Sequence, residues 1–222
     1  MKSFIVYADG SRRIEEMPMP TYGEYDALVK MESCGICNGT DMKIIHGKFK
    51  GIENYPVVLG HEGVGRVVEI GAKVRNYKIG DLVLLPFWGD VPEGYWSAWG
   101  TYSEFNTVTD AQAQFDDGLI PGEFAWAQNV LPEGFDPISS AMIITFREVL
   151  STGKIFGLEA NKSICVLGDN TCRLSDPSSD FFSAYLDILL PGSLRFFLRH
   201  LTQFYEVIHQ GVVSCNMEDP LL

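Results

Sequence analysis

The chain has 222 residues, of which 46% are hydrophobic and 21% are charged, a composition typical of ordinary globular proteins. This length fits one domain with a further fragment. The formal net charge of −12 provides no basic surface to neutralise phosphates, which excludes nucleic acids and anionic membranes from the expected partners. We therefore expect a small-molecule partner.

The N-terminal segment lacks the apolar core and the small-residue cleavage site of a signal peptide. No run reaches the roughly 18 uncharged apolar residues that a membrane span requires. The longest candidate, 181–201, contains Asp187, Pro191 and Arg195. The scattered cysteines favour free thiols or metal ligands over a disulfide framework; they are Cys34, Cys37, Cys165, Cys172 and Cys215. These features predict a cytoplasmic protein.

Short runs of alternating apolar and polar residues, separated by glycine, proline and asparagine, fill roughly the first 110 residues. They predict strands at 3–7, 26–32, 63–70, 82–85 and 101–108. This pattern is typical of a mostly antiparallel, barrel-like sheet. The aromatic stretch 87–99 is unusual for a loop. Its rings either line an apolar pocket or pack in a surface turn, and Trp96 and Trp99 are the first to test.

The pattern changes near residue 136, where Pro137 and serines precede apolar residues at helical spacing, which predicts a helix over 139–150. Residues 162–168 then predict a short buried strand ending in glycine, as at the start of a dinucleotide-binding unit. The stretch 174–222 contains one amphipathic segment, 193–213, and no further alternation of strands and helices. The predicted Rossmann-like segment is therefore incomplete.

Two motifs carry the strongest functional signal. The first is GHEGVG at 60–65, followed by Gly71 and by the pair Gly80 and Asp81; the second is CGIC at 34–37, followed by Thr40 and Asp41. Over residues 1 to about 168, the chain resembles the zinc-dependent medium-chain alcohol dehydrogenases.

The resemblance implies a fold class that is mainly β with an α/β portion. It places a GroES-like, partly open β-barrel at 1–135, a linking helix and the first strand of a Rossmann-like unit at 136–173, and a divergent helical tail at 174–222. The implied activity is hydride transfer from an alcohol or polyol to NAD(P) at a catalytic zinc.

A catalytic zinc needs three protein ligands and an open position for the substrate. The resemblance implies that Cys37 is the thiolate ligand, that His61 is the imidazole ligand, and that Glu62 is either a ligand or a close carboxylate that exchanges with water. It implies that the Thr40 hydroxyl hydrogen-bonds the substrate oxygen and passes its proton outward. Asp41 corresponds to the carboxylate that orients the histidine.

The sequence departs from this family pattern at several positions. Both Asn38 and Gly39 separate Cys37 from Thr40, where relatives have one residue, so we expect a displaced hydroxyl or a bulged loop. Lys43 stands where a histidine often ends the proton relay, and an ordinary lysine is a poor proton shuttle near neutral pH. The segment 85–104 has no cysteine, so no structural zinc is predicted.

The third zinc ligand of the family corresponds to Ile144, which cannot bind a metal. Glu148 lies four residues further on, on the same face of the predicted helix, and either reaches the metal or pairs with Arg147. The cofactor fingerprint keeps only Gly168, while Asn170 and Arg173 would crowd the pyrophosphate and the helix packing. NAD(P) is thus implied by the family, with Gly168 as the one retained binding glycine.

Alternatives to the dehydrogenase remain open from the sequence. The chain is either a zinc-dependent enzyme or a non-catalytic family member that binds zinc, and a weaker possibility is a module that joins a full-length partner subunit. Homo- and hetero-oligomers are both compatible with the pattern. Cys34 and Cys37 alone also fit a redox pair, which the strand-rich context disfavours.

Overall fold

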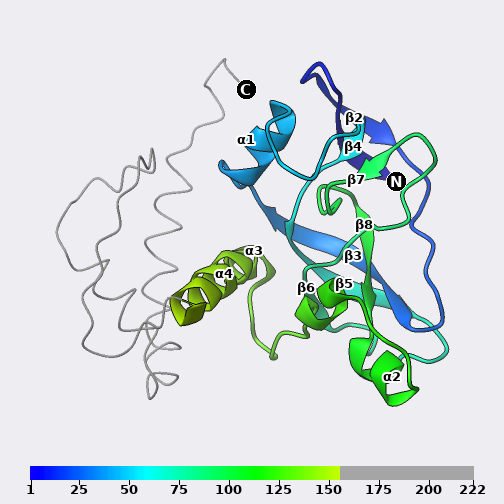
Figure 1. Cartoon of the computed structure of the whole chain (residues 1–222). Coiled ribbons are helices and arrows are strands. Elements are labelled where there is room, and N and C mark those ends of the chain that lie inside the picture. The colour runs from blue at the N-terminus through cyan, green and yellow to red at the C-terminus, as the bar shows by residue number, and fades with distance from the viewer. Residues whose placement is uncertain (156–222) are drawn as a thin grey trace, which may run out of the picture. The chain divides into compact units, whose positions relative to one another are not determined.

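The computed structural model describes residues 1–155. The chain divides into two units, Met1–Phe146 and Arg147–Leu222, and the sheets below all belong to the first (Figure 1). The predicted strand at 162–168, Gly168 and the predicted helical tail lie outside the described residues. No helix within residues 1–155 is long and apolar enough to cross a membrane.

Eight strands form two four-stranded sheets in the first unit. One sheet has the order β2-β1-β4-β7, with β1 at Lys2–Val6, β2 at Arg12–Glu16, β4 at Val57–Val58 and β7 at Trp96–Ser97. The other has the order β6-β5-β3-β8, with β3 at Asp26–Gly35, β5 at Glu62–Ile70, β6 at Leu82–Leu84 and β8 at Phe105–Thr109. All neighbours are antiparallel except β4 and β7, which confirms the mainly β fold class.

The strands of the second sheet bury both faces. Leu82 and Leu84 point to one side of β6 and Val83 to the other, as the two-residue period of a strand requires. Val83 joins a core cluster with residues of the neighbouring strands β3, β5 and β8, among them Val29, Val67 and Val108. Leu82 and Leu84 pack instead against Leu131 and against the start of the helical segment that follows.

The long strand β3 is irregular, and the irregularity positions its end. Its pairing with β5 shifts register between Leu28 and Val29 and again between Met31 and Ser33. Such bulges bend a strand and re-aim its side chains. After the second shift, β3 still pairs to its last residue, where Gly35 lies opposite Glu62.

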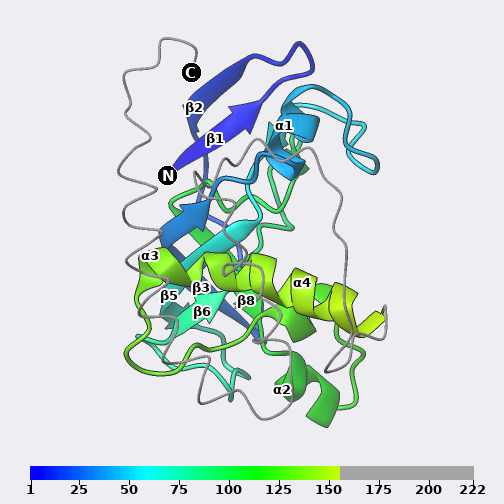
Figure 2. The ribbon, with the colours of Figure 1, turned by 90° about the vertical axis from the view of Figure 1, so that its left-hand side faces the viewer.

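Short helices connect and follow the strands. They are α1 at Thr40–Ile45, α2 at Ala111–Asp116, the 3₁₀ helix η1 at Glu123–Ala127, α3 at Pro137–Ser140 and α4 at Met142–Ile155. The single helix predicted at 139–150 is therefore wrong in its bounds, because α3 and α4 are separate elements. Asp136 caps α3 by accepting a 2.9 Å hydrogen bond from the Ser139 N–H. In Figure 2, α3 lies beside β3 and β5, which it contacts.

Several strand predictions also need correction. The strand predicted at 101–108 begins at Phe105, and the residues before it make only an isolated bridge between Ser3 and Ser103. The strand β2 was not predicted, because its residues are largely exposed and Ile14 is 70% exposed, so no apolar alternation marks it. The two-residue strands β4 and β7 are too short to leave a periodic signal.

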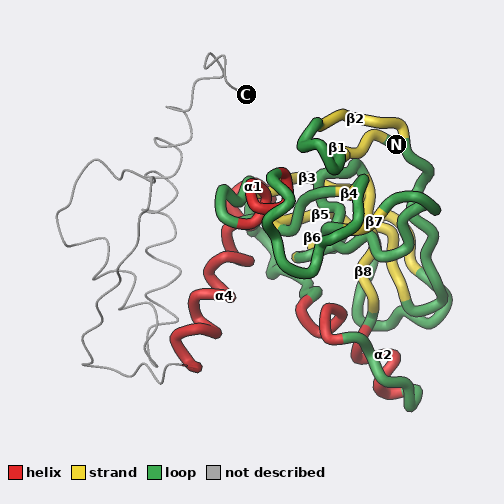
Figure 3. The backbone as a smooth tube through the Cα atoms, turned by 45° about the horizontal axis from the view of Figure 1, so that its top comes forward, coloured by secondary structure: helices red, strands yellow, loops and turns green. Residues whose placement is uncertain are grey.

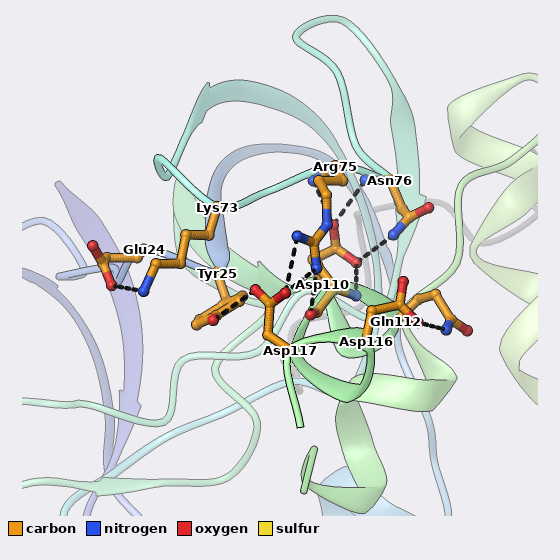
Figure 4. A network of polar contacts seen from close by, with 10 residues as sticks. Glu24, Tyr25, Lys73, Arg75, Asn76, Asp110, Gln112, Asp116 and Asp117 are labelled. Atoms are coloured by element: carbon orange, nitrogen blue, oxygen red, sulfur yellow. Dashed lines mark hydrogen bonds and ion pairs between the residues drawn. The ribbon is translucent and has the colours of Figure 1, made fainter. Parts of the chain in front are cut away.

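The helix α2 follows β8 (Figure 3), and Asp110 lies at this junction and holds the neighbouring backbone (Figure 4). Its carboxylate accepts hydrogen bonds from the backbone N–H groups of Arg75 (2.7 Å), Asn76 (2.8 Å) and Ala113 (3.0 Å), and from Asn76 Nδ2 (2.8 Å). Burial alone raises the pKa of Asp110, but these hydrogen bonds outweigh it and lower the pKa below its usual value. The Arg75 guanidinium also pairs with Asp117 at 3.0 Å.

Candidate metal centre

The pairing of β3 with β5 brings the two sequence motifs together. Gly35 ends β3 opposite Glu62, which begins β5, so Cys37 and His61 follow and precede this pair by one or two residues. A Cβ atom at Gly35 would lie too close to Glu62 Oε2, so a side chain at this position would displace the Glu62 carboxylate. The two motifs thus meet in space because these two strands pair.

Three potential ligand atoms meet at this point. One atom each from Cys37, His61 and Glu62 lies within 4.8 Å of the other two, and both His61 and Glu62 are buried. Ligands held 2.0–2.3 Å from a tetrahedral zinc lie roughly 3.3–3.8 Å from one another. A small inward movement of the side chains is therefore enough to reach a common ion.

The imidazole of His61 is oriented by Asp41. Its Nδ1 lies 3.2 Å from Asp41 Oδ1, while its Nε2 lies 3.9 Å from Glu62 Oε1. Nε2 is therefore the nitrogen that faces a second candidate ligand. Burial by itself lowers the pKa of His61, but the Asp41 carboxylate outweighs it and raises the pKa to about 8.

Asp41 is itself held in place. It is 2% exposed, and its Oδ2 accepts hydrogen bonds from the Cys37 N–H at 2.9 Å and from the Tyr102 hydroxyl at 2.5 Å. The same hydroxyl lies 2.9 Å from the carbonyl oxygen of Gly35. Although Asp41 Oδ1 and His61 Nδ1 approach each other, neither has a hydrogen-bond partner of good geometry in the described part of the chain. Sequence reasoning missed Tyr102, because no local pattern distinguishes its hydroxyl from that of any other tyrosine near a strand.

Cys37 and Cys34 have different surroundings. The Thr40 N–H donates to Cys37 Sγ at 3.4 Å, as expected for a thiol or thiolate at the start of a helix. Cys34 Sγ lies 2.9 Å from Thr101 Oγ1, and burial raises its pKa to about 12. A thiol that stays protonated is a poor nucleophile for disulfide exchange. This contrast favours Cys37 as a metal ligand and argues against a redox pair.

The loop between Cys37 and Thr40 is a turn in which Asn38 and Gly39 are exposed. Thr40 starts α1 and is partly exposed. Lys43, on the same helix, is exposed as well. The additional residue of the loop is accommodated by the turn, and the Asp41 N–H closes it by donating to the Cys37 carbonyl at 2.9 Å.

The residues after the barrel contribute differently from the family pattern. Ile144 is 4% exposed and packs in the core cluster with Val64 and Leu131. The neighbouring Thr145 donates a 2.8 Å hydrogen bond from Oγ1 to Glu62 Oε1. Glu148 is exposed on α4 and belongs to the second unit, so its role as a ligand stays a prediction.

An aromatic side chain covers the histidine. The ring of Trp99 lies 5.3 Å from that of His61 between centroids. The backbone of Trp99 has a φ angle of 65°, a left-handed conformation that costs a bulky residue about 1–3 kcal/mol. By contrast, Trp96 is exposed on β7 and has no such backbone strain.

The segment that holds the three candidate ligands matches a known domain. Residues 23–115, which hold Cys37, His61 and Glu62, match the alcohol dehydrogenase GroES-like domain. The match to this domain and the similarity to the dehydrogenases below support a relation to the medium-chain alcohol dehydrogenases. It is 29% identical to an alcohol dehydrogenase of Geobacillus stearothermophilus over 174 residues, which cover 70% of this chain and 47% of that one.

Two further relatives illustrate the range of this family. The chain is 39% identical to the sorbitol dehydrogenase of Ovis aries over 84 residues, or 37% of this chain and 23% of that one. A solved zinc-binding dehydrogenase from Sinorhizobium meliloti 1021, bound to NADP, aligns with a TM-score of 0.53 and 27% identity, covering 72% of this chain and 46% of that one. The chain thus spans about half or less of the length of these relatives.

Proposed function

We propose that this chain supplies the zinc-binding catalytic domain of an alcohol or polyol dehydrogenase that uses NAD(P). The observation that carries the proposal is the meeting of Cys37, His61 and Glu62 within 4.8 Å, with Asp41 behind the histidine. The match of residues 23–115 to the alcohol dehydrogenase GroES-like domain supports it. The substrate is a small-molecule alcohol, and the proposed setting is the cytoplasm.

The residues present fit a catalytic zinc. A thiolate, an imidazole and a carboxylate are the ligand types that zinc takes in proteins, and three protein ligands with an open fourth position are typical of catalytic sites. The contact between Asp41 and His61 Nδ1 fixes which nitrogen faces the metal, as carboxylates behind ligating histidines do. When bound, zinc supplies a Lewis acid that lowers the pKa of the alcohol hydroxyl.

Glu62 is our candidate for the third ligand. Its carboxylate is buried, faces His61 Nε2, and is steadied by the hydroxyl of Thr145. Ile144 provides no ligand at the family's usual position. Glu148 remains the competing candidate, and the two glutamates are separable by mutation.

The chemistry oxidises the alcohol to a carbonyl compound. A nicotinamide, when bound, would supply the acceptor for the hydride of the substrate C–H bond, and the alcohol hydroxyl would release a proton. We assign Thr40 to that proton: its hydroxyl accepts the hydrogen from the substrate oxygen and, being partly exposed, passes a proton to water. Gly168 is the residue that we assign to the cofactor phosphates, and it lies outside the described residues.

A specific observation favours a second candidate function. Ile144 is a buried core residue where the family has its third ligand, and this replacement suits a subunit that retains zinc without catalysing hydride transfer. In that case the chain works as a zinc-binding family member or as a partner of a full-length subunit. Cofactor titration separates the two functions.

The test is the zinc content of the purified full chain, measured by elemental analysis, together with titration of NAD⁺ and NADP⁺. We expect about one zinc per chain, which is lost in Cys37→Ala and His61→Ala and kept in the matched control Cys34→Ala. Loss in Glu62→Gln but not in Glu148→Gln would identify the third ligand. A wild-type protein without zinc would overturn the proposal, and zinc without cofactor binding would establish the second candidate.

A further inference from the structure

Aromatic rings gather around Trp99, whose ring contacts His61. Trp99 is the centre of this group: its ring lies 5.9 Å from Phe49 and 6.4 Å from Phe124, in addition to 5.3 Å from His61. Phe124 in turn stacks on Phe87 at 5.5 Å. Phe49 follows α1, Phe87 follows β6, Trp99 follows β7 and Phe124 belongs to η1. The fold therefore brings rings from three parts of the chain, at Phe49, in the stretch 87–99 and at Phe124, together in one aromatic wall.

The backbone holds Trp99 at a conformational cost. Trp99 and Gly100 have consecutive positive φ angles of 65° and 81°. Glycine adopts this conformation without strain, whereas tryptophan does so only where its surroundings force it. Hydrogen bonds fix the loop on both sides, from Trp88 N–H to the Trp99 carbonyl at 2.9 Å and from Thr101 N–H to the Gly60 carbonyl at 3.0 Å. The strained residue is thus fixed to the segment that leads directly into His61.

Packing alone explains only part of this arrangement. Trp99 contacts the core cluster that contains Ile44, Leu59 and Ala98, but its side chain is only partly buried. Phe124 is 46% exposed, so the aromatic wall continues from the core to the surface. A residue that is strained, partly accessible and placed over a candidate metal ligand has the features of a functional position.

We propose that Trp99 determines the substrate class by forming the wall of the alcohol pocket beside the metal centre and selecting aromatic alcohols over polyols. This inference rests on the proposed function. Flat rings pack well against an indole in offset or edge-on arrangements with centroids about 4.5–7 Å apart. A polyol placed against the same wall would lose water from hydroxyls that phenyl rings cannot hydrogen-bond.

The test measures binding, so it does not depend on turnover or on the cofactor. Benzyl alcohol and sorbitol are titrated into the zinc-loaded full chain, and binding is followed by ligand-observed NMR. The variants are Trp99→Phe, Trp99→Gly and the matched control Trp96→Ala, which removes an exposed indole from the same aromatic stretch. Trp99→Gly keeps the left-handed backbone without strain while it removes the ring, and its zinc content and thermal unfolding show that it is folded.

We expect benzyl alcohol to bind at least about tenfold more tightly than sorbitol, and Trp99→Gly to remove most of that preference. Trp99→Phe and Trp96→Ala are expected to keep it within about twofold. A zinc-loaded protein that prefers sorbitol, or a folded Trp99→Gly that keeps the preference, would overturn this inference and leave the proposed function intact. Absence of zinc from the wild type would instead overturn the proposed function and this inference with it.

Discussion

Two buried aspartates, at opposite ends of the described unit, are used in different ways. Asp110 is 1% exposed and accepts four hydrogen bonds, from Arg75, Asn76 and Ala113, so both of its oxygens are satisfied. Asp41 is 2% exposed, but only its Oδ2 accepts hydrogen bonds, while Oδ1 faces His61 Nδ1 without hydrogen-bond geometry. A buried carboxylate normally has its hydrogen bonds completed. Asp41 Oδ1 lacks such a bond, and a metal bound by His61 would bring the imidazole and this carboxylate into better hydrogen-bond geometry.

The largest effect on stability is expected for Asp110, whose carboxylate has hydrogen bonds to both oxygens. Asp110→Ala leaves four donors without an acceptor and removes the cap of α2, so the free energy of unfolding falls by about 3 kcal/mol. Urea unfolding measures this change. The control is Glu24→Gln in the same surface region (Figure 4), where the pair with Lys73 is exposed and little change in stability is expected. An equal loss of unfolding free energy in both variants would show that the hydrogen bonds of Asp110 make no particular contribution to stability.

For Asp41, we expect substitution to change zinc affinity more than stability. Asp41→Asn weakens zinc binding about 10–100-fold, because the amide no longer attracts the Nδ1 proton of His61. Competition with a chelator measures the affinity. Asp110→Asn serves as the crossed control, since it lowers stability and leaves the zinc affinity unchanged. If the two variants changed zinc affinity equally, the assignment of Asp41 to the metal centre and of Asp110 to stability would be wrong.

A smaller effect is expected one residue further from the metal. Tyr102→Phe removes the hydroxyl that donates to Asp41 Oδ2 at 2.5 Å and keeps the ring that packs edge-on against Phe4. Zinc affinity should fall by up to about tenfold, within the range for groups behind metal ligands. Because the ring is retained, the stability of the zinc-free protein should fall only by the contribution of one hydrogen bond to a carboxylate, about 1.5–3 kcal/mol. A fall in stability without a fall in affinity would assign Tyr102 to packing alone.

The smallest effect is expected in the pH dependence of stability, where the wild type is compared with Asp110→Asn. The pKa of Asp110 is lower in the folded chain than in the unfolded chain, where it is about 3.9. Its contribution to stability is therefore complete above that value and is lost as the pH falls through the folded pKa. The difference in melting temperature between the wild type and Asp110→Asn should narrow progressively below about pH 4. A constant difference across the acid range would exclude this linkage.

The sequence was a good guide where one motif lies on one strand pair. The strands at 26–32, 63–70 and 82–85 were predicted close to β3, β5 and β6, because glycines and alternating residues mark them. The structure also brings Cys37, His61 and Glu62 together, as the two motifs imply, while their ligation remains a prediction.

The remaining features depend on tertiary contacts that no local pattern records. Tyr102 reaches Asp41 across 61 positions of the sequence, and Thr145 reaches Glu62 across 83. Trp99 has a left-handed backbone in a loop that is hydrogen-bonded to Trp88 and Gly60. The amino-acid sequence around Trp99 does not indicate this conformation. Asp110 caps a short helix that the apolar periodicity does not reveal.

The glycine at the end of β3 limits what the centre can tolerate. Gly35 leaves room for the Glu62 carboxylate only because it has no side chain, and the Thr145 hydroxyl holds the same carboxylate. Replacing Gly35 with even the smallest side chain would displace Glu62, although no candidate ligand would be mutated. The choice between a three-donor and a two-donor centre is thus encoded in the main chain of a strand, at a position that a search restricted to metal-binding residue types would overlook.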